Sequence, residues 1–428
     1  MKKLLLLFII VSFPLALIAG VVQAQEPISA SYTTDIEFPD SLTFSLNAES
    51  NADITQVVLN YKIDKISTVT LINEIEPEFD VAKSVTTSWE WDMRKASLPP
   101  GAEIQYNWTI EDSAGHEFET AWQTVQFDDT RYNWKSLTEG KISLYWYRGD
   151  QSFAQELMNT ASETLDKLAS DTGAHLEQAV EIYIYATTKD LLSALVFPQE
   201  WTGGVAFIDY GILAIGIGPG DLAWGKRAMA HELAHLTTYQ MTFNPYNDIP
   251  TWLNEGLSMY AEGTLEQSFS YVLDNAVAED KLISVQTISS SFPTNQDEAR
   301  LSYAESYSLI DFLIKNYDQE KMLSLLSTFK QGSTYDNALN KVYDFDTAGL
   351  DDLWRSSLGL GPRVSPTPAP TPSPMLTPTP TPGTGFLGCQ KASASTGHSS
   401  AAWLGALGIL LLPGVGEVCR LRARRYKR

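Results

Sequence analysis

Two histidines four residues apart, with a glutamate beside the first, form the most distinctive chemical pattern in this chain. The segment 231–235 reads H-E-L-A-H, an H-E-x-x-H motif. On a helix, residues four apart share one face, so His231 and His235 can present two imidazoles to one metal ion. Glu232 is then placed to act on a water held by that ion. Twenty residues beyond His235, Glu255 offers a carboxylate that completes two histidines, one glutamate and an open fourth position, a catalytic zinc arrangement.

The motif is specific, because a chance H-E-x-x-H in a chain of this length arises on the order of once in a hundred. Two of the five histidines fall within it. A metzincin needs a glycine and a third histidine downstream, where Thr238 and Met241 stand instead. A glutamate is therefore the preferred third ligand. The alternatives are a helix with two surface histidines and no metal, and Glu255 as a solvated or capping residue.

Two helices must position these groups. Asp221 is a candidate N-cap for a largely apolar helix over about 222–239, as expected of a helix buried at the centre of a domain. Two proline-containing pairs then break the chain. A second helix over about 250–263 carries Glu255.

The segments 203–208 and 212–217, before the motif helix, predict two short strands around a turn. An edge strand beside the motif helix could pair with an extended peptide backbone. The alternative is an ordinary buried hairpin.

From about 141 to 358 the chain resembles the peptidase MA-like family of gluzincin-type zinc metallopeptidases. The resemblance covers about half of the chain and rests on three segments: A-H-E-L-A-H at 230–235, P-T-W-L-N-E-G-L at 250–257 and S-Y-A-E-S-Y-S-L at 302–309. It implies zinc as the metal, with His231, His235 and Glu255 as its ligands. It also implies Glu232 as the general base.

One position departs from the family. Many gluzincins carry a carboxylate four residues after the glutamate ligand, which orients a ligand histidine. Met259 stands there, and Glu262 lies on the same face but farther along the helix. The support of the ligand histidines is therefore left open.

A peptidase of this kind also needs a donor for the oxyanion. Tyr303 and Tyr307 are four residues apart and share a helix face. Tyr303 is the preferred catalytic candidate. With Ile310 and Ile314 the two tyrosines form a helical stripe, and such a stripe also fits plain core packing.

The two ends predict export and anchoring. Residues 1–24 read as a secretory signal peptide and 362–385 as a Pro/Thr-rich stalk. Residues 401–418 read as a transmembrane or sorting segment, followed by a basic cytoplasmic tail at 419–428. The alternatives are an uncleaved N-terminal anchor, and a tail that is cleaved and replaced by another anchor. A tail of either kind places the protein at the cell surface, outside the cytoplasm, with a single-pass membrane anchor at its C-terminus if the segment is retained.

Residues 27–128 alternate apolar and polar side chains in short segments, which is the period of half-buried strands. With turn signals such as D-S-A-G at 112–115, this predicts an all-β, immunoglobulin-like sandwich. Most of its four tryptophans are expected in the core or in packing between domains, with a sugar-binding platform as the alternative: Trp89, Trp91, Trp108 and Trp122.

Residues 140–358 predict an α+β, zincin-like peptidase domain, with a small sheet and a mainly helical C-terminal part. Its first elements are expected as strands at 142–147 and 180–185 around a helix at 151–170. The segment 134–139 is interpreted as an interdomain linker.

Charge and cysteine content restrict the partners. The formal net charge is −22, and since both ends are basic, the residues between carry close to −30. Such acidity disfavours nucleic acid and anionic membrane surfaces, and an affinity for basic peptides is a weaker expectation. Cys389 and Cys419 flank the apolar tail segment, so the folded domains contain no disulfide. Asn107 begins a weak glycosylation signal within a predicted strand.

These features together predict an exported, membrane-tethered zinc peptidase that hydrolyses peptides or proteins. One rival is a catalytically inactive surface binding or adhesion protein that retains the metallopeptidase fold. The other is a zinc hydrolase acting on a non-peptide bond. Cleavage specificity and oligomeric state are not predicted.

Overall fold

The computed structural model describes residues 27–63, 65–66, 71–196 and 203–363. The predicted signal peptide, the stalk beyond 363, the segment 401–418 and the basic tail lie outside these residues. No helix within the described ranges combines the length and hydropathy needed to cross a membrane.

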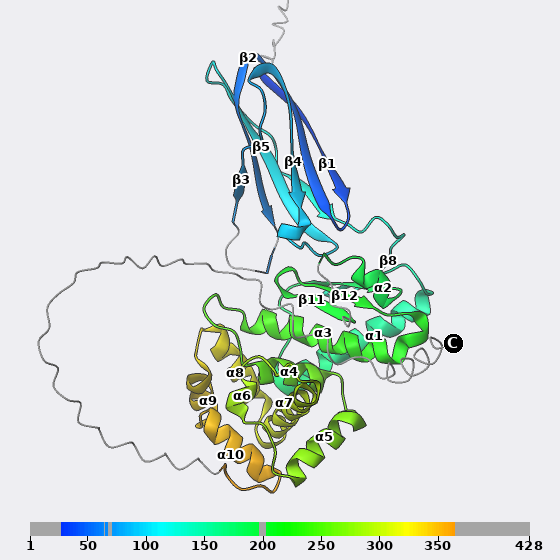
Figure 1. The fold of residues 1–428 in the computed structure, drawn as a ribbon, viewed down its shortest axis with the longest axis vertical. Helices are drawn as coiled ribbons and strands as arrows, with labels where there is room; N and C mark the ends of the chain where they lie inside the picture. Colours follow the sequence, from blue (N-terminus) through cyan, green and yellow to red (C-terminus); the bar gives the residue numbers. More distant parts are fainter. Residues whose placement is uncertain (1–26, 64, 67–70, 197–202, 364–428) are drawn as a thin grey trace, which may run out of the picture.

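The N-terminal unit is one antiparallel sheet, drawn at the top of Figure 1. Its seven strands are β1 (Ile28–Glu37), β2 (Ser41–Ile63), β3 (Asn73–Ile75), β4 (Ala82–Asp92), β5 (Ala102–Asp112), β6 (Glu117–Glu119) and β7 (Gln123–Phe127). The first half of β2 lies between β1 and β4, and its second half lies between β3 and β5. The predicted strands are confirmed. The immunoglobulin-like sandwich is not confirmed, because β2 and β5 together link the described strands of this unit into a single hydrogen-bonded sheet.

The tryptophans of this unit serve mainly in packing. Trp108 and Trp91 are buried, and Trp89 stacks on Trp91 with ring centres 5.6 Å apart. Trp122 is 37% exposed, under the ammonium of Lys62. The first three therefore belong to the core, as expected.

Asn107 is fully buried, and its side-chain amide donates to Glu119 and to the carbonyl of Thr120. A buried and hydrogen-bonded asparagine does not suit glycosylation, so the weak acceptor signal is explained by a structural role.

A second sheet begins the peptidase part, in the strand order β11-β12-β10-β9-β8. Its strands are β8 (Lys135–Glu139), β9 (Ile142–Trp146), β10 (Val180–Tyr185), β11 (Gly204–Phe207) and β12 (Ile212–Gly216). The three central strands are parallel, and β8 and β11 are antiparallel edges. The interpretation of 134–139 as a linker is wrong for most of the segment, because β8 pairs with β9.

The two faces of this sheet are covered by different partners (Figure 1). Helices α1 (Gln151–Thr172) and α3 (Leu222–Thr242) pack on one face around a buried cluster that includes Leu144 and Ile215. The other face places Tyr183 and Tyr185 in the same core cluster as Phe127 of the N-terminal unit. The two units therefore share a continuous core.

The C-terminal part is helical, as predicted (Figure 1). It contains α4 (Thr251–Ala261), α5 (Gln267–Ala278), α6 (Val285–Ile288), α7 (Gln296–Asn316), α8 (Gln319–Lys330), α9 (Tyr335–Tyr343) and α10 (Thr347–Ser357), and the short α2 (Thr188–Leu192) precedes β11. Helix α4 crosses α7 closely at Gly256, where a Cβ would lie 2.5 Å from the carbonyl oxygen of Ser306. Only glycine permits this approach, which sets α7 beside the helix that carries Glu255.

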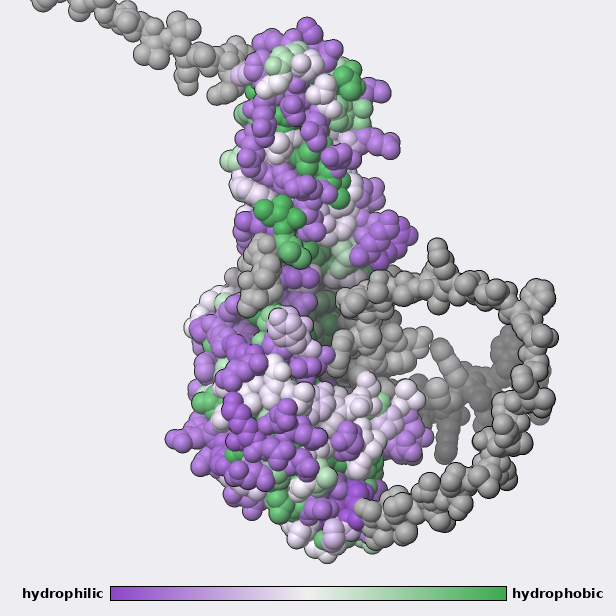
Figure 2. Space-filling model, turned by 90° about the vertical axis from the view of Figure 1, so that its left-hand side faces the viewer, coloured by the Kyte–Doolittle hydropathy of each residue, from purple (hydrophilic) through white to green (hydrophobic). Residues whose placement is uncertain are grey.

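The surface agrees with the acidic composition. Figure 2 shows hydrophilic residues over most of one face, with small hydrophobic areas on the N-terminal unit. Three large exposed apolar residues of that unit are Leu71, Ile72 and Val81.

Candidate metal centre

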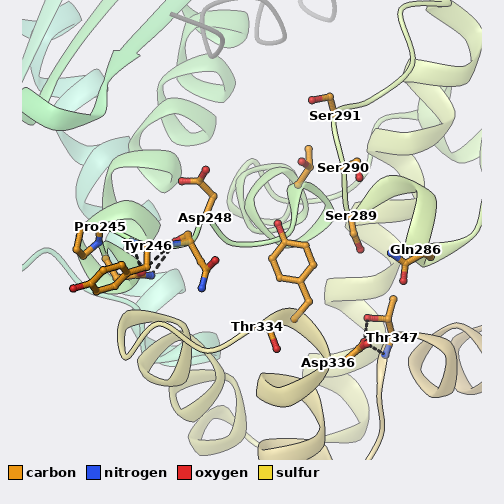
Figure 3. A pocket seen from close by; sticks show the side chains of 14 residues that line it. Pro245, Tyr246, Asp248, Gln286, Ser289, Ser290, Ser291, Thr334, Asp336 and Thr347 are labelled. Atoms are coloured by element: carbon orange, nitrogen blue, oxygen red, sulfur yellow. Dashed lines mark hydrogen bonds between the residues drawn. The ribbon is translucent and has the colours of Figure 1, made fainter. Parts of the chain in front are cut away.

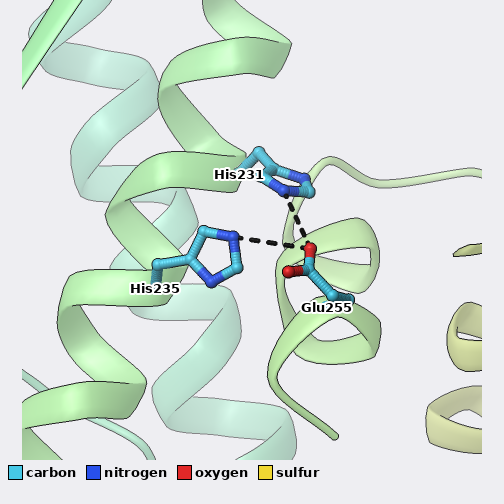
Figure 4. Close-up of side chains that lie close together, drawn as sticks. All are labelled: His231, His235 and Glu255. Atoms are coloured by element: carbon cyan, nitrogen blue, oxygen red, sulfur yellow. Dashed lines mark ion pairs between the residues drawn. The ribbon is translucent and has the colours of Figure 1, made fainter. Parts of the chain in front are cut away.

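Helices α3 and α4 bring the three predicted ligands together (Figure 4). His231 and His235 lie on one face of α3, and Glu255 faces them from α4. Glu255 Oε2 is 3.6 Å from Nε2 of each histidine. All three side chains are buried, and one ligand atom from each lies within 4.8 Å of the others. Within the described residues, this is the cluster of histidine and carboxylate groups that could hold a metal ion.

The other nitrogen of each imidazole is held by a neighbour. His231 Nδ1 lies 2.7 Å from Glu262 Oε1, and His235 Nδ1 lies 3.1 Å from Asn254 Oδ1 and 3.0 Å from Ser258 Oγ. A carboxylate and an amide carbonyl only accept hydrogen bonds, so both Nδ1 atoms carry protons. Both Nε2 atoms are therefore directed at the ligand cluster.

Arg227 extends this support by another layer. Its Nε and Nη2 donate to Glu262 Oε2 at 3.2 and 2.8 Å, and its Nη1 lies 2.9 Å from Glu266 Oε1. Arg227 is four residues before His231 on α3. One face of this helix therefore supplies both the ligand His231 and the guanidinium that orients Glu262, the hydrogen-bond partner of His231. The paired guanidinium holds the Glu262 carboxylate in place beneath the imidazole.

The support of His231 could not be decided from sequence, and the roles of Asn254, Ser258 and Arg227 were not predicted. Glu262 was placed on the same face but farther along the helix, since it follows Glu255 by seven residues rather than four, and its role stayed open. Seven residues are two helical turns, so the two carboxylates do share a face. Spacing alone was therefore a usable signal for Glu262, while the polar residues around Glu255 gave a weaker one.

The residues fit a zinc ion. Ligand atoms of one tetrahedral zinc lie about 3.3 Å apart, given bond lengths near 2.0 Å, against 3.6 Å between Glu255 Oε2 and each Nε2 here. Three buried atoms of the site have no hydrogen-bond partner: Glu232 Oε2, His235 Nε2 and Glu255 Oε2. Buried polar atoms are rarely left unpaired, so their convergence indicates a site for a cation.

The charges of the site indicate the same. Burial alone would lower the pKa of His231, but the neighbouring carboxylates of Glu255 and Glu262 raise it to about 10. The pKa of Glu255 is lowered, since the two histidines outweigh the effect of burial. The carboxylates therefore create a strong preference for positive charge at the ligand cluster.

Glu232 lies where α3 meets the edge strand. A Cβ on Gly204, at the start of β11, would lie 3.3 Å from both Cγ and Oε1 of Glu232. Burial raises the pKa of Glu232 to about 7, and the charge of His231 opposes this. A glutamate near neutral pKa suits general base chemistry.

The structure separates the two candidate tyrosines. Tyr303 on α7 is 4% exposed. Burial is the main cause that raises its pKa, and the negative charges of Glu255, Glu232 and Glu262 raise it further. Tyr307 is held elsewhere, near Tyr260, with its ring 6.1 Å from that ring. Tyr303 is therefore the tyrosine beside the site.

A polar hollow of about 750 Å³ opens at the start of α4 (Figure 3). Its walls come from the loop after α3, from α6 and the residues that follow it, and from α9, and they include Asp248, Ser290 and Tyr335. Thr251 in its lining lies four residues before Glu255, but the three ligands are not part of the lining. The hollow is thus a neighbour of the ligand cluster rather than the cluster itself.

The family of the peptidase part is shown by its sequence. Residues 160–359 match the family model described as the Peptidase MA superfamily. This part of the chain belongs to that superfamily, and its glutamate on a second helix makes it of the gluzincin type, as the resemblance implied. No curated protein matches the chain in sequence.

Several solved structures are similar to the chain at low identity. An M1 zinc metallopeptidase from Deinococcus radiodurans has 12% identity over 81% of this chain and 97% of that one, with a TM-score of 0.32. A mutant of an M1 zinc metallopeptidase from the same organism, bound to a Tyr-Ser-Ala substrate, has 11% identity over the same shares and a TM-score of 0.33. An aminopeptidase N family protein from Idiomarina loihiensis has 9% identity over 78% of this chain and 72% of that one, with a TM-score of 0.28. At such low TM-scores these similarities add no argument to the family match.

Proposed function

We propose that this protein is an exported, membrane-tethered zinc peptidase, with His231, His235 and Glu255 as metal ligands and Glu232 as general base. The observation that carries the proposal is the buried cluster in which both Nε2 atoms lie 3.6 Å from one carboxylate oxygen. Membership in a peptidase superfamily supports the reaction class.

Zinc is the metal that this ligand set favours, because two imidazoles and one carboxylate with an open position are typical of catalytic zinc. A zinc ion held there supplies a Lewis acid that acidifies water and polarises the scissile carbonyl. Glu262, Asn254 and Ser258 hold the histidines in the orientation that this requires.

Glu232 takes the role of proton carrier. Its unpaired Oε2 is positioned to accept a proton from the attacking water and to pass it to the leaving amine. Gly204 leaves room for this carboxylate beside β11. Tyr303 is the candidate donor to the oxyanion, since its hydroxyl is close enough to the three carboxylates for them to affect its pKa.

The substrate is a peptide or protein held in extended form along β11. This strand is a sheet edge that pairs only with β12 among the described strands, so its other side offers backbone groups to a ligand. Backbone pairing lets the enzyme accept varied side chains, and the net charge of −22 is compatible with basic peptides.

The remaining parts of the proposal concern the flanking regions. Export by the signal peptide 1–24 and anchoring through 401–418 at the cell surface rest on the sequence patterns given above. We also infer an immunoglobulin-like sandwich from the N-terminal sheet. Tyr32 of β1 and Phe44 of β2 both place their rings against Tyr106 of β5, at 6.2 and 4.9 Å, as expected when the two halves fold onto each other.

The test compares wild type with Glu232→Gln for bound zinc and for cleavage of a mixed peptide library. We expect about one zinc per chain in both proteins and cleavage by the wild type alone. A chain without zinc overturns the assignment. Zinc without cleavage favours the inactive binding protein, unless a panel of non-peptide substrates is hydrolysed, which favours the other rival.

A further inference from the structure

The turn between β11 and β12 is held by the N-terminal unit. In the connection from β2 to β3, the backbone N–H of Ile66 donates to the carbonyl of Asp209 at 2.6 Å. The ammonium of Lys65 lies 5.0 Å from the centre of the Tyr210 ring. The side chain of Ile66 also fills the space beside Gly211, where a Cβ would lie 3.2 Å from Ile66 Cδ1. Figure 1 shows the near ends of β2 and β3 facing this hairpin.

Helix α3 holds the same turn from the opposite direction. The hydroxyl of Tyr239 donates to Asp209 Oδ1 at 2.5 Å. Tyr239 lies four residues after His235, on the helix that carries two of the candidate ligands. Asp209 is therefore bound through its carbonyl by the N-terminal unit and through its carboxylate by the motif helix.

The strand that leads into this turn lies against the candidate general base. Gly204 is at the start of β11, and a Cβ on this residue would lie only 3.3 Å from Glu232. The strand has four residues and a single partner strand in the described sheet. Because so short an element is fixed mainly at its ends, a shift of the turn displaces β11 relative to Glu232.

We propose that Lys65 and Ile66 position the hairpin formed by β11 and β12, so that the N-terminal unit determines where β11 lies beside Glu232. This inference deepens the proposed function and rests on it, since β11 is the strand assigned to the substrate backbone. The N-terminal unit is then part of the substrate-binding machinery and not only a spacer. Loosening the contact raises KM, while the metal content changes little, because none of the ligands touches it.

The test uses the full-length protein with Ile66→Pro, which removes the N–H that binds Asp209. Leu71→Pro is the matched control, since Leu71 lies in the same connection with its side chain 70% exposed. Ile66→Ala is a second variant, which keeps the backbone bond and removes the contact with Gly211. Hydrogen exchange over 204–211, bound zinc and steady-state peptide kinetics are measured for each.

We expect Ile66→Pro to speed exchange over 204–211 and to raise KM, each by about threefold to tenfold, the effect of one lost hydrogen bond. Ile66→Ala gives a smaller change in the same direction, and Leu71→Pro gives none. Unchanged exchange in Ile66→Pro overturns the inference, as does faster exchange with an unchanged KM. A wild type without peptidase activity overturns the proposed function instead, and exchange over 204–211 then decides the positioning by itself.

Discussion

His231 Nδ1 donates to Glu262 Oε1 over 2.7 Å, and this bond determines which nitrogen of the imidazole faces the ligand cluster. With Nδ1 protonated, only Nε2 offers a lone pair. Arg227 pairs with Glu262 at 2.8 Å and fixes its position, so the orientation exists before any ligand arrives. The site is therefore preorganised through two layers of side chains.

Removing the charge of Glu262 tests this support. We expect Glu262→Gln to weaken zinc binding about 10- to 100-fold, the usual loss when the partner of a ligand histidine is changed. The glutamine oxygen still accepts a hydrogen bond, but Arg227 loses one of its two ionic partners. Competition with a chelator of known affinity measures the change.

Glu266→Gln is the control for this variant. Glu266 also pairs with Arg227, at 2.9 Å, but its side chain is 44% exposed and it does not touch a ligand. Its zinc affinity stays close to wild type, because an exposed ion pair contributes little. Equal losses in both variants would show that general charge, and not the bond to His231, supports the site.

The ligand pair and its helices could be predicted because the pattern is local. H-E-x-x-H spacing needs one helix, and α3 runs over Leu222–Thr242 where it was expected. Asp221 precedes that helix, but its side chain makes no capping hydrogen bond. The role of Glu262 was underestimated because the rule of four residues was applied where two turns also reach the histidine.

Other features depend on contacts that no local period contains. Strand β8 has five residues and forms because β9 offers it an edge, so the segment looked like a linker. Helices α2 and α6, with five and four residues, are too short to show a helical period. The strands of the N-terminal unit could be predicted from sequence. Their pairing into one sheet through β2 could not, because it depends on the register between segments far apart in the chain.

Metal removal is the next prediction. Without a cation, Glu255 Oε2 and His235 Nε2 remain buried without partners, which costs stability. Zinc at a thousandfold excess over its Kd stabilises the native state by about 4 kcal/mol, so chelation lowers the melting temperature by several degrees and added zinc restores it. Calorimetry with and without chelator measures this, and His235→Ala removes the response. A melting temperature indifferent to zinc in the wild type contradicts the site.

Gly204 is predicted to control Glu232 without affecting the metal. In Gly204→Ala the new methyl lies 3.3 Å from Cγ and Oε1 of Glu232, closer than ordinary contact, so the carboxylate must shift. A displaced base lowers kcat by about tenfold to a hundredfold, while zinc content is unchanged. Gly220→Ala is the control, because a Cβ there meets no atom within 4 Å. Wild-type kcat in both variants would show that Gly204 does not determine the position of Glu232.

Glu305 predicts how stability depends on pH. This carboxyl group on α7 is fully buried, and Oε1 accepts the N–H of Ile283 at 2.8 Å while Oε2 has no partner. Burial raises its pKa from 4.5 to about 8, although the bond from Ile283 and the charge of Arg363 oppose the rise. In the native state the Glu305 carboxyl group is therefore mainly protonated and neutral near neutral pH.

The sign follows from comparing the folded and unfolded states. Since the folded pKa is the higher one, the contribution of Glu305 to stability is complete below pH 4.5 and is lost as the pH rises to about 8. Within this window the loss approaches about 1.4 kcal/mol per pH unit. Glu305→Gln keeps an acceptor for Ile283 and does not ionise, so its unfolding free energy should fall less steeply than that of wild type. Urea unfolding across the window measures both slopes, with Glu163→Gln, exposed on α1, as the control. Parallel curves for wild type and Glu305→Gln would mean that Glu305 is already ionised in the native protein, and that Arg363 compensates its charge more fully than the burial of the carboxyl group indicates.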